Sequence, residues 1–287
     1  MEPLTWEGEV PELRSPMLVC AFRGWNDAAA AASTALATVA NSLDGDLIAQ
    51  VDPEDFFDFQ ANRPTITLRE GQTRDIEWPE NNLIAAQAPT AERDLVLLDG
   101  TEPSLRWRTF SESLAAAAER LNVETVITMG SLVAEVAHTM PVPITGLASD
   151  AKMVEELGLT RSTYEGPTGI VGVLHDACRR QGMSSASLWA AVPHYVAAVP
   201  NPKAALALLR RLEGLTGIAV DATELEEETE SYEEQVGRAV AANPEIEELV
   251  QRIESEQAEQ LGDGEDLPSA ETIAREFQRF LRQRGEQ

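Results

Sequence analysis

One group of residues that could do chemistry lies in FRGWNDAA (22–29), directly after an apolar run. Gly24 lets the chain turn sharply, so Asn26 and Asp27 come at the start of the next helix and at the edge of the predicted sheet. Open α/β sheets bind their ligands at this edge. The same two side chains are also good helix caps, so capping alone would explain them. The glycine fingerprint of dinucleotide binding is absent, and an NAD site is therefore not predicted.

A second group lies in GTEPSLRWR (100–108), after another apolar run at 94–99. Glu102 and Arg106 bring opposite charges to a second strand end. Arg106 could pair with Glu102, or it could hold an anionic ligand through its guanidinium group. The sequence leaves both interpretations open.

A histidine in a stiffened loop is a candidate general base. His138 lies in AHTMPVP (137–143), where Pro141 and Pro143 restrict the backbone. A general base needs this kind of fixed position at the mouth of a sheet. No serine or cysteine partner is evident beside it in the sequence, so a structural role is the alternative.

The segment STYEGPTGI (162–170) predicts a tight turn into a helix that begins at Thr168. Backbone N–H groups at a helix start can bind an anion, and Glu165 precedes this one. We expect Gly166 or Gly169 to adopt a conformation, or a close approach, that a Cβ atom would obstruct. No lysine follows, so the segment is not a phosphate-binding P-loop, and a turn without a ligand is the alternative.

These groups do not add up to a complete catalytic constellation. The sequence has no GxSxG, HExxH or CxxC motif. Its three histidines and two cysteines have no spacing that gathers metal ligands, so neither a metal nor a cofactor is predicted. Cys20 and Cys178 each lie among apolar residues, and we expect both to be free, buried thiols. The candidate residues of a ligand-binding cleft are Asn26, Asp27, Glu102, Arg106, His138, Glu165 and Thr168.

The composition is that of an acidic globular protein. The 287 residues include 49 Asp and Glu against 22 Lys and Arg, for a net charge of −27. Such a surface repels phosphate backbones and anionic lipids, so we expect neither a nucleic acid nor a membrane as a partner. No apolar run approaches the ~20 residues that span a bilayer, and no signal peptide is evident. A cytoplasmic location is therefore expected.

Apolar runs of strand length alternate with helical patterns before residue 217. Uninterrupted apolar runs are typical of inner strands of a sheet that helices cover on both sides. The predicted fold class is therefore α/β, with residues 1–217 forming a three-layer α/β/α sandwich around a mixed sheet. The predicted central strands lie near 17–22, 94–99, 124–129 and 187–192. Further strands are expected at 47–51, 65–68, 82–86 and 144–149, and helices at 28–41, 106–121, 168–182 and 202–215.

Residues 218–287 are predicted to form an acidic helical extension. The stretch 221–266 contains 17 acidic and 2 basic residues. Thr223 with Glu226 fits a capping box at the first helix start, and Asp221 with Glu224 is a close variant. A second helix is expected from Asn243-Pro244, with Ile246, Leu249, Val250 and Ile253 on one stripe. A third is expected from Ser269, with Ile273, Phe277, Phe280 and Leu281 on one face. Each stripe must be covered, either by this subunit or by another one.

Six segments together resemble the proteasome assembly chaperone 2 family, and most of all its actinobacterial branch. They are GWNDAA (24–29), DPEDFFDF (52–59), EPSLRWR (102–108), HTMPVP (138–143), YEGPTGI (164–170) and VPHYVAAVPNPKA (192–204). The resemblance covers roughly residues 15–285, and it implies a fold similar to that of nucleoside phosphorylases. Family members that act on proteasomes tend to end in a hydrophobic-Tyr-any-residue docking motif. This chain ends in Arg284-Gly285-Glu286-Gln287, so the resemblance does not carry that docking mode over.

Two functional hypotheses follow. The first is an oligomeric cytosolic binding or assembly protein, chaperone-like, for which similar phosphorylase-like folds suggest a trimer. The second is a small-molecule enzyme of the nucleoside phosphorylase or hydrolase type that uses a cleft at the strand ends. The second hypothesis requires the seven candidate residues to converge in one cleft, whereas the first does not.

Overall fold

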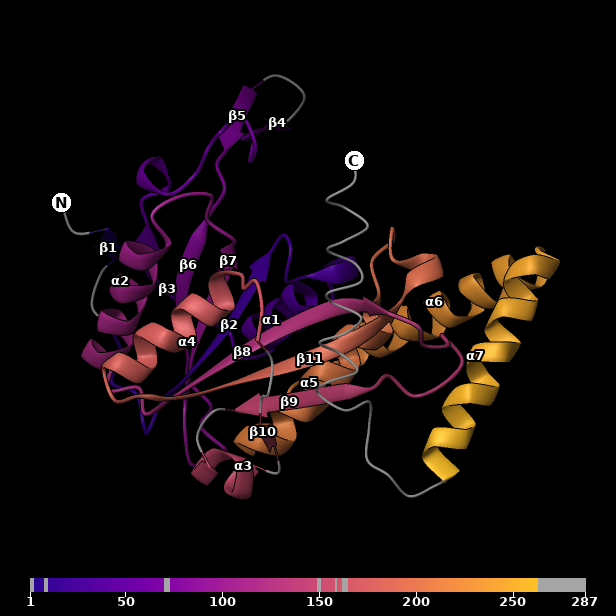
Figure 1. Cartoon of the computed structure of the whole chain (residues 1–287). Coiled ribbons are helices and arrows are strands. Elements are labelled where there is room, and N and C mark those ends of the chain that lie inside the picture. The colour runs from indigo at the N-terminus through magenta and orange to yellow at the C-terminus, as the bar shows by residue number, and fades with distance from the viewer. Residues whose placement is uncertain are drawn as a thin grey trace.

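A mixed sheet with helices on both faces forms the centre of the molecule (Figure 1). The computed structural model describes residues 3–7, 10–69, 73–148, 151–157, 159–161 and 165–262. Within them, the central sheet has nine strands. In sheet order these are β1 (Leu4–Trp6), β3 (Asp46–Val51), β6 (Asn81–Ala86), β7 (Leu95–Thr101), β2 (Met17–Arg23), β8 (Thr125–Ala134), β11 (Ser184–Pro193), β9 (Ile144–Ala148) and β10 (Thr160–Arg161).

The four predicted central strands are confirmed, and they run parallel to one another. β2 pairs with β7 on one side and with β8 on the other, and β11 pairs with β8. Antiparallel neighbours, β6 and β9, flank this group, which makes the sheet mixed as predicted. In β2, Val19 and Ala21 are buried on one face while Leu18, Cys20 and Phe22 are buried on the other. Burial on both faces explains why residues 17–22 contain no polar side chain.

Two helical layers cover the sheet. On one face lie α1 (Ala31–Ser42), α3 (Ala151–Leu157) and α5 (Pro202–Thr216), and on the other lie α2 (Trp107–Arg120) and α4 (Ile170–Arg180). The structure therefore is a three-layer α/β/α sandwich. Three short 3-10 helices lie in the loops, η1 (Ala28–Ala30), η2 (Pro53–Asp55) and η3 (His194–Val196).

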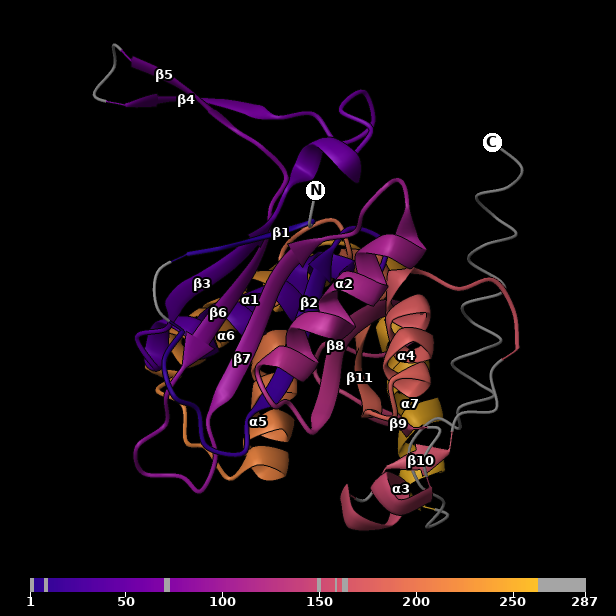
Figure 2. The same ribbon diagram turned by 90° about the vertical axis from the view of Figure 1, so that its left-hand side faces the viewer.

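Residues Thr65–Arg69 form a strand, but they do not join the main sheet as predicted. This strand, β4, pairs only with β5 (Thr73–Glu77), and the hairpin projects away from the body (Figure 2). The prediction of a strand at 65–68 is confirmed, but β-branched and apolar residues identify a strand without identifying the sheet that it joins. Ile66 and Ile76 face each other across this hairpin.

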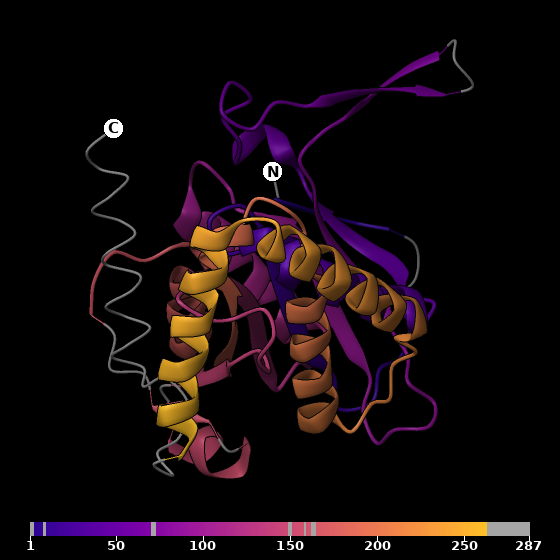
Figure 3. The same cartoon turned by 90° about the vertical axis from the view of Figure 1, so that its right-hand side faces the viewer.

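Two more helices follow α5, namely α6 (Thr223–Ala241) and α7 (Pro244–Gly262) (Figure 3). The second begins at the predicted Asn243-Pro244 pair. Its apolar stripe packs on this same chain, because Val250 and Ile253 are buried against Ala137 and Tyr232. The third helix, predicted from Ser269, lies outside the described residues. None of the helices in the described ranges is long and apolar enough to cross a membrane.

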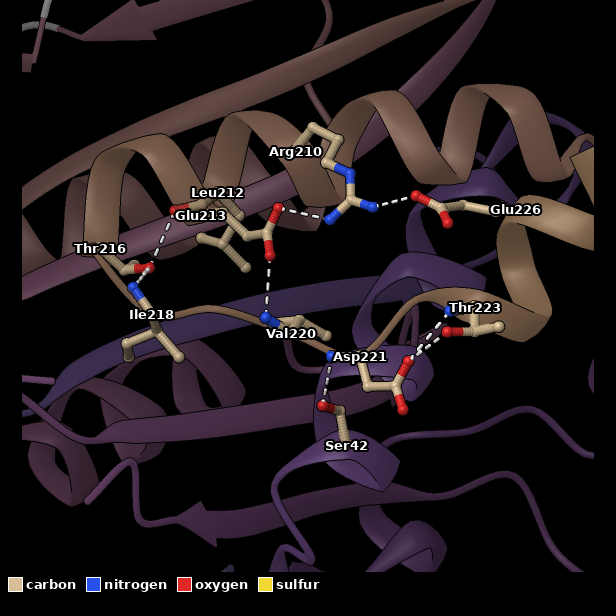
Figure 4. Close-up of polar contacts among 10 residues, drawn as sticks. All are labelled: Ser42, Arg210, Leu212, Glu213, Thr216, Ile218, Val220, Asp221, Thr223 and Glu226. Carbon is tan, nitrogen blue, oxygen red and sulfur yellow. Dashed lines mark hydrogen bonds and ion pairs between the residues drawn. The ribbon is translucent and has the colours of Figure 1, made fainter. Parts of the chain in front are cut away.

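The start of α6 is fixed differently from the predicted capping box (Figure 4). Thr223 donates both its N–H and its hydroxyl to the Asp221 carboxylate, at 3.1 and 2.8 Å. Glu226 instead pairs with Arg210 on α5. The N–H of Asp221 donates to the Ser42 hydroxyl at the end of α1, at 2.7 Å. These contacts join the first turn of α6 to the sandwich.

Candidate functional site

Glu102 and Asn26 meet at the carboxyl ends of β7 and β2. The backbone N–H of Glu102 donates to the carbonyl of Arg23 at 2.9 Å, which holds the two strand ends together. Glu102 Oε1 accepts hydrogen bonds from Asn26 Nδ2 at 3.1 Å and from the backbone N–H of Ile170 at 2.9 Å. Asn26 is only 2% exposed. One carboxylate oxygen thus joins both strand ends to the start of α4.

The turn before α4 approaches this carboxylate closely. A Cβ atom added to Gly169 would lie 2.8 Å from Glu102 Oε1 and 3.1 Å from both amide atoms of Asn26. The expected close approach is therefore confirmed at Gly169. Thr168 is exposed, and its side chain folds over Gly172 in the first turn of α4. Glu165 is exposed as well.

Asp27 caps α1, which is the simpler of its two predicted roles. Its Oδ1 accepts the N–H groups of Ala32 and Ser33 at 2.8 and 3.3 Å, and its Oδ2 accepts the Ser33 hydroxyl at 2.6 Å. Burial raises the pKa of this carboxyl, although its hydrogen bonds oppose that change. These three hydrogen bonds commit both carboxylate oxygens of Asp27 to the start of its own helix.

The chain between Asp27 and α1 is strained. Ala29 and Ala30 both adopt the left-handed region, each with φ of 53°. This conformation is unfavourable for a residue with a Cβ atom. Two residues distant in sequence support it: Asn201, before α5, donates its N–H to the carbonyl of Ala29 at 2.9 Å, and Ser131 of β8 donates its hydroxyl to that of Ala28 at 2.8 Å.

Arg106 does not join Glu102. Its guanidinium group pairs with Asp55 at 2.7 Å and lies over the ring of Phe56, 5.8 Å from its centroid. Both charged side chains are about half exposed to solvent. Arg106 therefore joins η2 to the start of α2 at the surface.

His138 is buried beneath α6 and α7, with 5% exposure. Its backbone N–H donates to Tyr195 Oη at 2.8 Å, and Nδ1 of its ring lies 2.8 Å from the same oxygen. Burial lowers the pKa of His138, so the ring is neutral at pH 7 and Nδ1 can accept the tyrosine O–H. The carbonyl of His138 accepts from Lys203 Nζ at 2.6 Å, and that ammonium pairs with Glu233 on α6, also at 2.6 Å. These contacts fasten the His138 loop to α6.

Glu165 lies at the surface, and the other six candidates divide among separate contacts. The structure brings Asn26 and Glu102 together, with Thr168 beside Gly169, while Asp27 bonds its own helix. Arg106 and His138 find other partners. The sequence did not identify the backbone N–H of Ile170 as a partner of Glu102, because every residue except proline has such a group. It also missed Tyr195 as the partner of His138, although both residues lie in loops that follow neighbouring strands.

The described residues offer little for metal or thiol chemistry. They contain no group of three or more His, Cys, Asp or Glu side chains that could hold a metal ion. Cys20 and Cys178 are free and buried, as predicted. Burial raises the pKa of both thiols, that of Cys178 to about 11, so neither is a reactive thiolate at neutral pH.

Comparison with known proteins gives the lineage. The PAC2 family model matches residues 21–240, more than half of the chain. The chain is similar to the crystal structure of a PAC2 family protein from Streptomyces avermitilis, with 45% identity and a TM-score of 0.76, over 82% of this chain and 99% of that one. It is similar to a proteasome-assembly chaperone homologue from Mycobacterium tuberculosis, with 43% identity, a TM-score of 0.74 and the same coverage.

A more distant likeness concerns the fold alone. The archaeal proteasome activator PbaB of Pyrococcus furiosus shares 18% identity and a TM-score of 0.67, over 83% of this chain and 99% of that one. No curated protein matches the chain.

Proposed function

Since this chain belongs to the PAC2 family, we propose that it is a cytosolic, homo-oligomeric protein that acts by binding another protein during its assembly. Turnover of a small molecule is not part of this function. The proposed function is chaperone-like, and the partner is a protein.

The observation that carries this proposal is how the polar groups at the strand ends are used. Glu102 accepts two hydrogen bonds within the chain through one oxygen, and Asp27 accepts three at the start of α1. His138 is held by Tyr195 beneath α6. Protonation of Asp27 would weaken its hydrogen bonds to the start of α1, and a base at His138 Nδ1 would have to lose the Tyr195 hydroxyl, so these contacts suit support of the fold. Their arrangement favours a scaffold over an active site.

The β4–β5 hairpin supports the homo-oligomeric part of the proposal. Ile66, Leu68 and Ile76 are 57, 62 and 54% exposed, on a hairpin that projects from the body (Figure 2). A free-standing two-stranded hairpin is at best marginally stable in water, and a contiguous exposed apolar face favours association. We propose a small closed ring, with a trimer as the first expectation.

The first protein partner to test is a proteasome subunit, because the M. tuberculosis relative is described as a proteasome-assembly chaperone homologue. The experiment is sedimentation velocity of the full chain with purified proteasome α subunits of the source organism, alone and mixed. We expect a complex heavier than either component. Absence of a complex at micromolar concentrations would overturn the proposed partner.

A second arm addresses the enzyme hypothesis. The full chain is incubated with nucleosides and inorganic phosphate, and release of the free base is followed by chromatography. We expect no turnover above that of a heat-inactivated sample. Turnover that disappears in Glu102→Ala, while the fold persists, would overturn the proposal in favour of a phosphorylase-like enzyme.

A further inference from the structure

One face of the β4–β5 hairpin carries three exposed large apolar side chains and one arginine. Ile66 and Leu68 are two residues apart and so share a face, and Ile76 lies directly opposite Ile66. The position opposite Leu68 is Arg74, so among the paired residues 65–69 and 73–77 this face carries one positive charge and no negative one. Trp78 follows at the base, where the centroid of its ring lies 4.8 Å from that of Phe59.

The hairpin also differs from the rest of the chain in charge. Residues 63–78 contain three arginines and three acidic residues, so the hairpin has no net charge in a chain of −27. Two acidic bodies repel each other, and a contact between copies forms most easily where the charge is low. The hairpin is one such place.

Residues 269–287 are a second such place. They contain four arginines and three acidic residues. Their sequence predicts a helix with one apolar stripe, made by Ile273, Phe277, Phe280 and Leu281. The nine residues of this stripe would extend about 12 Å along a helix, close to the length of a five-residue strand such as β4. The stripe and the hairpin face therefore match in length, in apolar character and in freedom from strong negative charge.

The geometry of α7 favours a contact between copies over one within a chain. In Figures 1 and 3, α7 runs away from the hairpin, so the chain leaves Gly262 at the far end of the molecule. A hairpin stacked face to face on a second hairpin would bury two Arg74 side chains with no acidic partner among the paired residues of either face, which disfavours that contact.

We propose that the hairpin face of Ile66, Leu68 and Ile76 receives the apolar stripe of residues 269–287 from a second copy. This inference rests on the proposed homo-oligomer and names the two surfaces that form it. The contact is heterologous, since a different surface is used on each copy, and repeated around an axis it closes a ring.

The experiment uses two variants of the full chain that each remove one surface. The hairpin variant is Ile66→Ser with Ile76→Ser, and the tail variant is Phe277→Ser with Phe280→Ser. The matched control, Thr65→Ser with Thr67→Ser, alters the opposite face of β4. Circular dichroism and urea denaturation check that the body of each protein remains folded, and native mass spectrometry gives the assembly state.

We expect the wild type and the control to be oligomers of the same size, and each variant alone to be a monomer with its dissociation constant raised at least tenfold. Mixing the two variants should then give a 1:1 heterodimer and no larger ring. Each partner in that mixture keeps the one surface that the other has lost.

Other outcomes distinguish a failure of the hairpin–tail contact from a failure of the proposed homo-oligomer. A monomeric wild type would overturn the homo-oligomer itself. An oligomeric wild type whose tail variant stays oligomeric would overturn the hairpin–tail contact alone. This includes the case in which only the hairpin variant dissociates, which would indicate that the hairpin binds the body or the hairpin of its neighbour. Two monomeric variants that do not combine would also overturn the contact.

Discussion

Glu102 should contribute more to stability than other acidic residues on the surface, because one of its oxygens joins three elements. In Glu102→Ala, the N–H of Ile170 loses its acceptor, and Ile170 is fully buried. Leaving a buried donor unsatisfied costs about 1–3 kcal/mol, and hydrogen bonds to a charged group contribute about 1.5–3 kcal/mol each. The two bonds share an acceptor atom and are not additive, so we expect Glu102→Ala to lower the free energy of unfolding by about 3 kcal/mol. Glu102→Gln keeps the acceptor but loses its charge at the start of α4, which should cost about 1 kcal/mol.

The assay is urea denaturation at pH 7 and one fixed protein concentration, because the stability of an oligomer depends on concentration. Glu112→Ala is the matched control, since Glu112 is exposed on α2, and it should change stability by less than about 0.5 kcal/mol. Adding Asn26→Ala in a double-mutant cycle should give a coupling energy of about 1 kcal/mol with Glu102. If Glu102→Ala unfolds within about 0.5 kcal/mol of the wild type, the carboxylate does not hold the strand ends together.

Three further predictions concern other sites. Gly169→Ala should lower the free energy of unfolding by more than about 1 kcal/mol, because its Cβ would lie 2.8 Å from a carboxylate oxygen. The control, Gly214→Ala, places its Cβ in open space and should be neutral or stabilising. Equal denaturation midpoints for the two variants would contradict this prediction. Burial lowers the pKa of His175 from 6.5 to about 4, so between these values the unfolded chain binds one more proton and stability falls as the pH falls. At pH 5 the loss should be about 1–2 kcal/mol relative to pH 7.5, and His175→Gln should lack it; an unchanged pH dependence in this variant would exclude His175 as the cause. Native protein should react with a thiol reagent at Cys20 and Cys178 only as fast as it unfolds, and immediate labelling without denaturant would contradict their burial.

The central strands were predictable because a strand that is buried on both faces requires apolar residues at nearly every position. A strand covered on both faces, such as Met17–Arg23, contains only apolar residues until its exposed end. The sequence of the hairpin indicates its strands less clearly. Thr73–Glu77 has a single large apolar residue, so it was not predicted as a strand, and nothing in Thr65–Arg69 indicates that it leaves the main sheet.

The candidate site was predictable only in part. Asn26 and Glu102 were found because the parallel strands before them end at one edge of the sheet. The partner of Arg106 was not found, because Asp55 belongs to a loop that only the folded chain brings near. The role of His138 required knowing that Tyr195 follows the neighbouring strand in register and that α6 covers both. Residue type indicates which groups can act, and tertiary contacts decide which of them are already engaged.

The central claim is that this protein acts by binding a protein during assembly. The most direct measurement is native mass spectrometry of proteasome core particle formation from separately purified α and β subunits of the source organism, with and without the full chain. We predict that the chain appears in complexes with α subunits and is absent from the finished particle, and that it changes the rate at which that particle forms. Identical assembly with and without the chain, and no complex that contains it, would contradict the claim.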